Sequence, residues 1–130
     1  MTLFPKNHIL LVFFLVAINT LALAQKSANT PSIDSLSRTY ANNLYIQPQV
    51  AKKAALEWLK ESKKLNIELQ VVRALYALGN LSNINGDYKS TISYTSDAIT
   101  LLKKLQIENG LASCYNILAL GHKNLGEYPK

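Results

Sequence analysis

The chain has 130 residues and a formal net charge of +6 at neutral pH. Hydrophobic residues make up 48% of it, and only five glycines and four prolines are present, which excludes collagen-like and low-complexity sequences. These values predict one small domain with a modest hydrophobic core rather than a disordered chain.

The first 24 residues have the pattern of a secretory signal peptide. Lys6 and His8 form a short basic start, residues 9–18 are an uninterrupted apolar run, and residues 22–24 read Ala-Leu-Ala, a small-residue cleavage site. An uncleaved anchor is the alternative, but this run is shorter than the roughly twenty residues that span a bilayer. We therefore expect export to the periplasm or the cell exterior, with a membrane involved only if the segment stays uncleaved.

Helical spacing of apolar residues follows a polar, flexible lead-in at residues 25–31. Apolar side chains recur at steps of three and four, and no alternating run is long enough for a strand, so the predicted fold class is all-α. Pro31 and Pro48 are typical first residues of helices. The predicted helices cover about residues 32–45, 48–65, 68–84, 87–105 and 108–124.

Each of the three central helices has one side that we expect to face the core. The inward positions predicted for the central helices are Ala51, Ala54, Ala55, Trp58, Leu59, Ser62 and Leu65; Val71, Val72, Leu75, Leu78, Gly79 and Ser82; and Tyr88, Thr91, Ile92, Thr95, Ala98, Ile99, Leu102 and Leu105.

The single cysteine, Cys114, cannot form an intramolecular disulfide and is expected to be buried as a small apolar residue.

The chain repeats itself at an offset of forty residues, since residues 63–90 match residues 103–130 at eight positions. A fixed period of this length predicts stacked helical units, each of which buries an apolar face against its neighbour. The identities gather at a helix end and at a turn. They are Lys63/Lys103, Lys64/Lys104, Leu65/Leu105, Ile67/Ile107, Glu68/Glu108, Leu78/Leu118, Gly86/Gly126 and Tyr88/Tyr128.

The turn at residues 85–87, Asn-Gly-Asp, predicts how one helix ends and the next begins. Gly86 can take the left-handed conformation that closes a helix. Asp87 can accept backbone N–H bonds at the start of the following helix.

Residues 72–105 resemble a tetratricopeptide repeat (TPR), which consists of two antiparallel helices. The matching positions are Leu75 in place of the usual Trp, Leu78-Gly79, Gly86-Asp87-Tyr88 and Ala98. Residues 112–128 match again through Tyr115, Leu118 and Gly126-Glu127-Tyr128. The sequence departs from the family pattern at Ser82, Thr91, Thr95 and Ala119.

The resemblance implies a short right-handed solenoid of stacked helix pairs. Its units would be about residues 32–66, 67–106 and 107–130, with the last one incomplete. The forty-residue period exceeds the usual thirty-four, which implies a longer second helix in each pair. This long form is similar to the repeats of exported bacterial TPR proteins and of sensor proteins that carry TPR units.

The incomplete last unit leads to an expectation about its surface. Leu111, Tyr115 and Leu118 would leave apolar surface uncovered, because a complete array usually ends in a polar capping helix. The chain is therefore expected to be a fragment or a truncated product. The alternative is a homo-oligomer that covers the C-terminal helix.

The sequence offers no constellation of residues for catalysis or for a cofactor. His122 has no second ligand at metal-binding spacing, and the glycines form no phosphate-binding loop. Ser113, Cys114 and His122 have no orienting carboxylate in reach, so we predict neither an enzyme nor a cofactor. Export and dispersed lysines disfavour nucleic-acid binding.

A binding surface for a protein or peptide is what remains. In TPR proteins the exposed side of each first helix lines a concave groove, and these residue types can bind peptides. Asn80 matches one element of the clamp that some relatives use, but Tyr76 stands where the clamp needs Lys. By resemblance the groove residues are Arg73, Tyr76, Asn80, Asn83, Ser113, Asn116 and Lys123.

Two functions follow from a binding surface of this kind. The groove residues also have a simpler interpretation, as the solvent-exposed side of amphipathic helices. The first function is a protein–protein interaction scaffold. The alternative is the sensory region of a longer bacterial histidine kinase or transcriptional regulator, with the effector part beyond Lys130.

Overall fold

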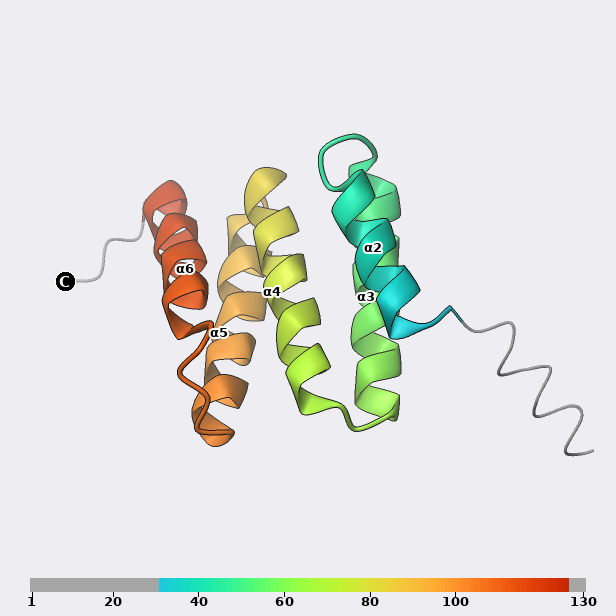
Figure 1. Cartoon of the computed structure of the whole chain (residues 1–130). Helices are drawn as coiled ribbons and strands as arrows, with labels where there is room; N and C mark the ends of the chain where they lie inside the picture. Colours follow the sequence, from blue (N-terminus) through green and yellow to red (C-terminus); the bar gives the residue numbers. More distant parts are fainter. Residues whose placement is uncertain (1–30, 127–130) are drawn as a thin grey trace, which may run out of the picture. The chain divides into compact units, whose positions relative to one another are not determined.

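The structure is a computed structural model that describes residues 31–126. These residues form helices and no strand, which confirms the all-α prediction. The predicted signal peptide, most of the lead-in, and Glu127 and Tyr128 lie outside the described residues. The helices are α2 (Ile33–Asn43), α3 (Pro48–Lys64), α4 (Glu68–Ile84), α5 (Tyr88–Lys104) and α6 (Leu111–Leu125), as Figure 1 shows.

The predicted bounds hold best for the three central helices. The last helix begins at Leu111 rather than at residue 108, because Gly110 at its N-cap has a left-handed backbone with φ of 96°. The Leu111 N–H donates to the Glu108 carbonyl in the preceding turn. Residues 108–110 therefore form a turn and not the first turn of the helix.

Helix α4 is the centre of the arrangement, since it contacts each of the other four helices. Consecutive helices pack side by side in antiparallel order (Figure 1). Helices α2, α4 and α6 also contact in that order, whereas the backbones of α3 and α5 do not pack against each other. One side of the described domain is thus built from α2, α4 and α6.

The core confirms most of the predicted inward positions. Leu78 and Leu102 are 1% exposed and Cys114 is 1% exposed, as expected. Leu65 was wrongly placed inside, because it caps α3 within a turn and is 56% exposed. Three further residues of α4 are buried on a side that the sequence did not predict: Ala74, Ala77 and Leu81.

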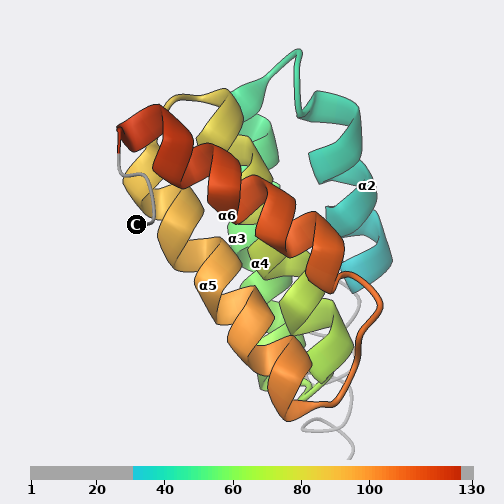
Figure 2. The same ribbon diagram turned by 90° about the vertical axis from the view of Figure 1, so that its left-hand side faces the viewer.

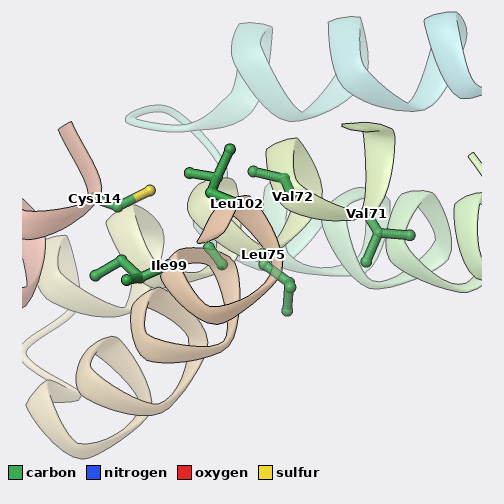
Figure 3. Packing of buried hydrophobic residues seen from close by; sticks show 7 residues of the cluster. Val71, Val72, Leu75, Ile99, Leu102 and Cys114 are labelled. Atoms are coloured by element: carbon green, nitrogen blue, oxygen red, sulfur yellow. The ribbon is translucent and has the colours of Figure 1, made fainter. Parts of the chain in front are cut away.

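The buried residues of the larger core cluster come from three helices (Figure 3). Leu102 of α5 lies between Val72 of α4 and Cys114 of α6 in this view. Burial of such side chains is worth about 1.5–3 kcal/mol each, so this cluster is a main source of stability. It also ties α6 to α4 through α5.

Three of the connections share one turn geometry. Residues 66, 86 and 106 are left-handed, with φ of 55°, 76° and 56°. The next residue's N–H donates across the turn, from Ile67 to Ser62 at 3.0 Å, from Asp87 to Ser82 at 2.9 Å, and from Ile107 to Leu102 at 3.0 Å. This pattern satisfies free carbonyls at a helix end. The structural period of the turns is therefore twenty residues, half the period of the sequence match.

The left-handed position holds glycine in only one of these three turns. Gly86 confirms the prediction, and Gly126 has the same conformation at the end of α6 with φ of 79°. Asn66 and Gln106 occupy the other two. A residue with a side chain pays about 1 kcal/mol for this conformation, and asparagine tolerates it better than glutamine.

Asp87 caps α5 as predicted. Its Oδ1 accepts a hydrogen bond from the Ser90 N–H at 3.2 Å. Hydrogen bonds from Ser90, first from its side chain and then from its backbone, lower the pKa of the Asp87 carboxyl. The charged form is thus favoured in the folded protein.

Gly79 allows α4 and α5 to approach closely. A Cβ atom built at Gly79 would lie 2.6 Å from Cγ2 of Thr95, well inside van der Waals contact. The approach at Gly121 of α6 is less tight, since a Cβ there would lie 3.1 Å from Cγ2 of Thr91 and 3.1 Å from Cγ1 of Ile92. These glycines are therefore matched to the two threonines of α5.

Thr91 and Thr95 are fully buried although both carry a hydroxyl. The Thr95 hydroxyl donates to the Thr91 carbonyl at 2.6 Å, and the Thr91 hydroxyl donates to the Asp87 carbonyl at 3.0 Å. The polar atoms are satisfied within α5, so only methyl groups face α4 and α6. Both threonines are therefore packed tightly although they are polar.

The close approach at Gly79 predicts a specific rescue. Gly79→Ala should lower the free energy of unfolding by about 1–3 kcal/mol, because the added methyl overpacks against Thr95. Thr95→Ser removes the methyl and keeps the hydroxyl, and in that background Gly79→Ala should be neutral or stabilising, since alanine favours helices. Urea unfolding of the two single variants and the double variant measures the coupling. Additive effects would contradict this contact.

The shared turn predicts opposite effects at equivalent positions. Gln106→Gly should stabilise the protein by about 0.5–1 kcal/mol, because it relieves left-handed strain. Gly86→Ala should destabilise it by about 1 kcal/mol through the backbone alone, since the new Cβ would meet nothing closer than 4.0 Å. Urea midpoints give both values. If both substitutions raised the free energy of unfolding, or both lowered it, the two turns would not share one geometry.

The Asp87 cap predicts a dependence on pH. Because the folded pKa lies below the unfolded value, the carboxylate contributes stability above the unfolded pKa, and this contribution is lost as the pH falls through the folded pKa. Asp87→Asn should lower the urea midpoint at about pH 7 and have little effect at about pH 2. A difference that stays constant across this range would exclude the charge as its cause.

Candidate functional site

A hollow in the described domain lies over α4, on the side built from α2, α4 and α6. It is a pocket of about 490 Å³, within the range of ligand-binding pockets, about 300–1,000 Å³. Its walls come from all five described helices and from the turn before α6. The lining residues are Tyr40, Trp58, Leu69, Val72, Arg73, Tyr76, Ala77, Leu102, Ile107, Asn109, Gly110, Ser113 and Cys114.

Two aromatic rings at one end of the pocket are held by hydrogen bonds. The Tyr40 hydroxyl donates to the Ala77 carbonyl at 3.0 Å, and the Trp58 Nε1–H donates to Gln70 Oε1 at 3.2 Å. The ring centroids are 6.4 Å apart with an angle of 53° between the planes. This wall is pre-ordered, because each ring has both a packing partner and a polar anchor.

Tyr40 stays protonated in this setting. Burial raises the pKa of its hydroxyl, and a hydrogen bond with the Asn80 side chain opposes that effect in part. The phenol is therefore a hydrogen-bond donor fixed to the backbone of α4. It has no features of a catalytic acid or base.

Arg73 is the one charged residue among the described residues that line the pocket. Its side chain is exposed and forms no ion pair within residues 31–126, where the paired cations are Arg38, Lys60, Lys64 and Lys104. The pocket thus combines an apolar floor with a single cation at its edge. A carboxylate could bind there without displacing an existing partner.

The structure brings together some of the predicted groove residues and separates others. Arg73 and Tyr76 of α4 and Ser113 of α6 line the pocket. Asn80 lies beside Tyr40, and Asn83 has a buried Oδ1 that no described residue bonds. Two remaining residues of α6, Asn116 and Lys123, are exposed and do not line the pocket.

Sequence reasoning missed the far walls of the pocket. The sequence predicts Trp58 on a core stripe and Tyr40 within the first helix, and it predicts the turn residues Asn109 and Gly110 inside a helix. The single Trp of the chain and the Asn-Gly pair are signals that could have marked these positions. Their proximity to Arg73 depends on helix packing.

The acidic, histidine and cysteine side chains of residues 31–126 form no metal site. No group of three or more His, Cys, Asp or Glu side chains in that range could hold a metal ion. Burial raises the pKa of the Cys114 thiol, so the thiol stays protonated and is a poor nucleophile.

Comparison of the chain with models of protein families, with curated proteins and with solved structures finds no match. Within the described range no helix is both long enough and apolar enough to cross a membrane.

Proposed function

We propose that the protein is a non-catalytic interaction module of the TPR type that binds an extended peptide segment of a partner protein. The observation that carries this proposal is the pocket over α4, where an apolar floor lies beside a cation that has no ion-pair partner within residues 31–126. Three of the predicted groove residues, Arg73, Tyr76 and Ser113, belong to it.

The chemistry of the lining supports a peptide as the ligand. Apolar side chains of a peptide gain free energy from burial against Val72, Ala77 and Leu102, at about 25 cal/mol per Å². Tyr76 offers a flat aromatic contact, and Arg73 offers paired donors for a carboxylate. An extended segment with one apolar and one acidic side chain uses both features.

The arrangement of the helices supports the TPR part of the proposal. In such a solenoid α2, α4 and α6 would be the first helices of successive pairs, and first helices line the concave side. Here these three helices contact in order and carry most of the pocket. The recurring turns would place each new helix pair in the same register.

We also propose that the protein acts after export, on the composition of residues 1–24. Its peptide partner would then be a protein of the periplasm or of the cell exterior.

Charge reversal at Arg73 tests the proposal. Short random peptides displayed on phage are selected on the wild-type protein, and the enriched peptides are then titrated by fluorescence polarisation. Arg73→Glu should weaken binding at least tenfold, because a charge-assisted hydrogen bond is worth about 1.5–3 kcal/mol. Tyr76→Ala should weaken binding by a similar factor.

Lys53→Glu is the matched control, since Lys53 is exposed on α3 and does not line the pocket. It changes the net charge by the same amount and should leave the affinity within about twofold. Circular dichroism of all variants checks that the fold is kept. Enriched peptides that bind the Arg73→Glu and Tyr76→Ala variants as well as the wild type would refute a peptide site in this pocket.

A further inference from the structure

The pocket lies on the side of α4 where Figure 2 shows α2 and the turn before α6. One part of it, which we call the aromatic end, consists of Tyr40, Trp58, Tyr76 and Ala77. The Tyr40 hydroxyl and the Trp58 Nε1–H already donate hydrogen bonds within the domain, at 3.0 Å and 3.2 Å. A polar group buried against these two rings gains no donor in place of water, so this end favours an apolar group.

The two rings favour an aromatic occupant over an aliphatic one. Their planes are inclined by 53°, so an inserted ring meets surfaces of two orientations. Aromatic pairs prefer edge-to-face or offset contacts with centroids about 4.5–7 Å apart, and these contacts add to the gain from burial. The volume of about 490 Å³ is sufficient, since an engineered cavity of about 150 Å³ in another protein already takes a benzene molecule.

The charge beside the aromatic end is that of Arg73, and no acidic residue of the described range lines the pocket. Two carboxylates are close to lining residues in the sequence. Glu68 forms an ion pair with Lys104 at 3.3 Å. Glu108 is exposed in the turn before α6 and forms no ion pair with Arg73 within residues 31–126. The Arg73 guanidinium can therefore pair with a carboxylate of the ligand.

The position of Arg73 relative to the aromatic end sets a spacing. Arg73 and Ala77 are four residues apart on α4, so they lie on one side of the helix and about 6 Å apart along its axis. In an extended peptide, alternate side chains point to the same side and are about 6.6 Å apart. Two ligand side chains separated by one residue thus match Arg73 and the aromatic end.

We propose that the pocket binds a peptide motif in which one residue separates an aromatic residue from an acidic residue. The aromatic side chain lies against Tyr40 and Trp58, and the acidic side chain pairs with Arg73. The side chain between them points away from α4. This inference rests on the proposed peptide-binding function and names the class of peptide that the pocket takes.

The selection of random peptides on the wild-type chain tests the motif and the proposed function separately. Enriched peptides should share an aromatic residue two positions from Asp or Glu, in either order. Enriched peptides that lose affinity for the Arg73→Glu variant but lack this pattern would overturn the motif and leave the peptide site. An absence of enriched peptides would overturn both.

A change at the aromatic position of an enriched peptide tests the ring contact. Cyclohexylalanine has a similar size and no π system, so it should weaken binding about two- to tenfold. Trp58 is the single tryptophan, and its indole N–H gives one signal in NMR spectra of the whole chain. That signal should shift with the aromatic peptide and shift much less with the cyclohexylalanine peptide. Equal affinities, or saturable binding without a shift of the Trp58 signal, would overturn the proposal.

A double-mutant cycle tests the pairing of the acidic residue with Arg73. Replacement of the acid by its amide should weaken binding to the wild type at least tenfold, and binding to the Arg73→Gln variant by less than about twofold. Arg73 is exposed, so this variant should keep the fold. An equal loss in both backgrounds would show that the acid does not contact Arg73 and would overturn the motif.

Lys123→Gln is the matched control variant, because Lys123 is exposed on α6 and does not line the pocket. In this background the amide peptide should show the same loss as with the wild type. The spacing is tested by removing the middle residue of the motif or by inserting one more, since both changes turn the acid to the opposite side of the peptide. Both peptides should bind as weakly as the amide peptide, and equal affinity at every spacing would overturn the inference.

Discussion

The three-residue turn that follows α3 and α4 is the constraint on which the rest of the domain depends. In each of these turns one residue has a left-handed backbone, and one backbone N–H donates a hydrogen bond to a carbonyl of the preceding helix. The chain thereby reverses its direction within three residues. Because the following residue is already the N-cap of the next helix, the reversal also fixes where that helix starts. Helices of seventeen residues then meet along their full length, and their apolar stripes stay in register.

The sequence predicts the helices and the central turn well, because these depend on local chemistry. Gly86 can take a left-handed backbone without strain, and the Asp87 carboxylate can accept N–H bonds at a helix start, so each residue signals its place in the turn. Gln106 shows the limit of such reasoning, since nothing in a glutamine signals a left-handed backbone, and tertiary packing overrides its preference. The start of α6 was misplaced for a related reason, because Gly110 was counted as part of a helix.

The pocket was predictable only in part. Arg73, Tyr76 and Ser113 follow from helical periodicity and the TPR resemblance, which tell which side of a helix is free. Tyr40 and Trp58 come from other helices, and their position near Arg73 depends on how α2 and α3 pack against α4, where Ala74 and Ala77 are buried in one cluster with Trp58. Small residues in the middle of helices determine how closely the helices that line the pocket can approach one another. This effect cannot be derived from the periodicity of the sequence.

Helix α2 is the shortest helix described, with one fully buried side chain, Leu36. Its contacts with the centre include the hydrogen bond from Tyr40 to the Ala77 carbonyl. Opening of an element with few buried side chains costs less than global unfolding, so amide exchange in α2 should be the fastest among the described helices. Since Tyr40 is a wall of the pocket, any occupant shares its binding energy with the ordering of α2. Binding of a ligand in the pocket and local opening of α2 are therefore thermodynamically linked, and a bound ligand would slow amide exchange in α2.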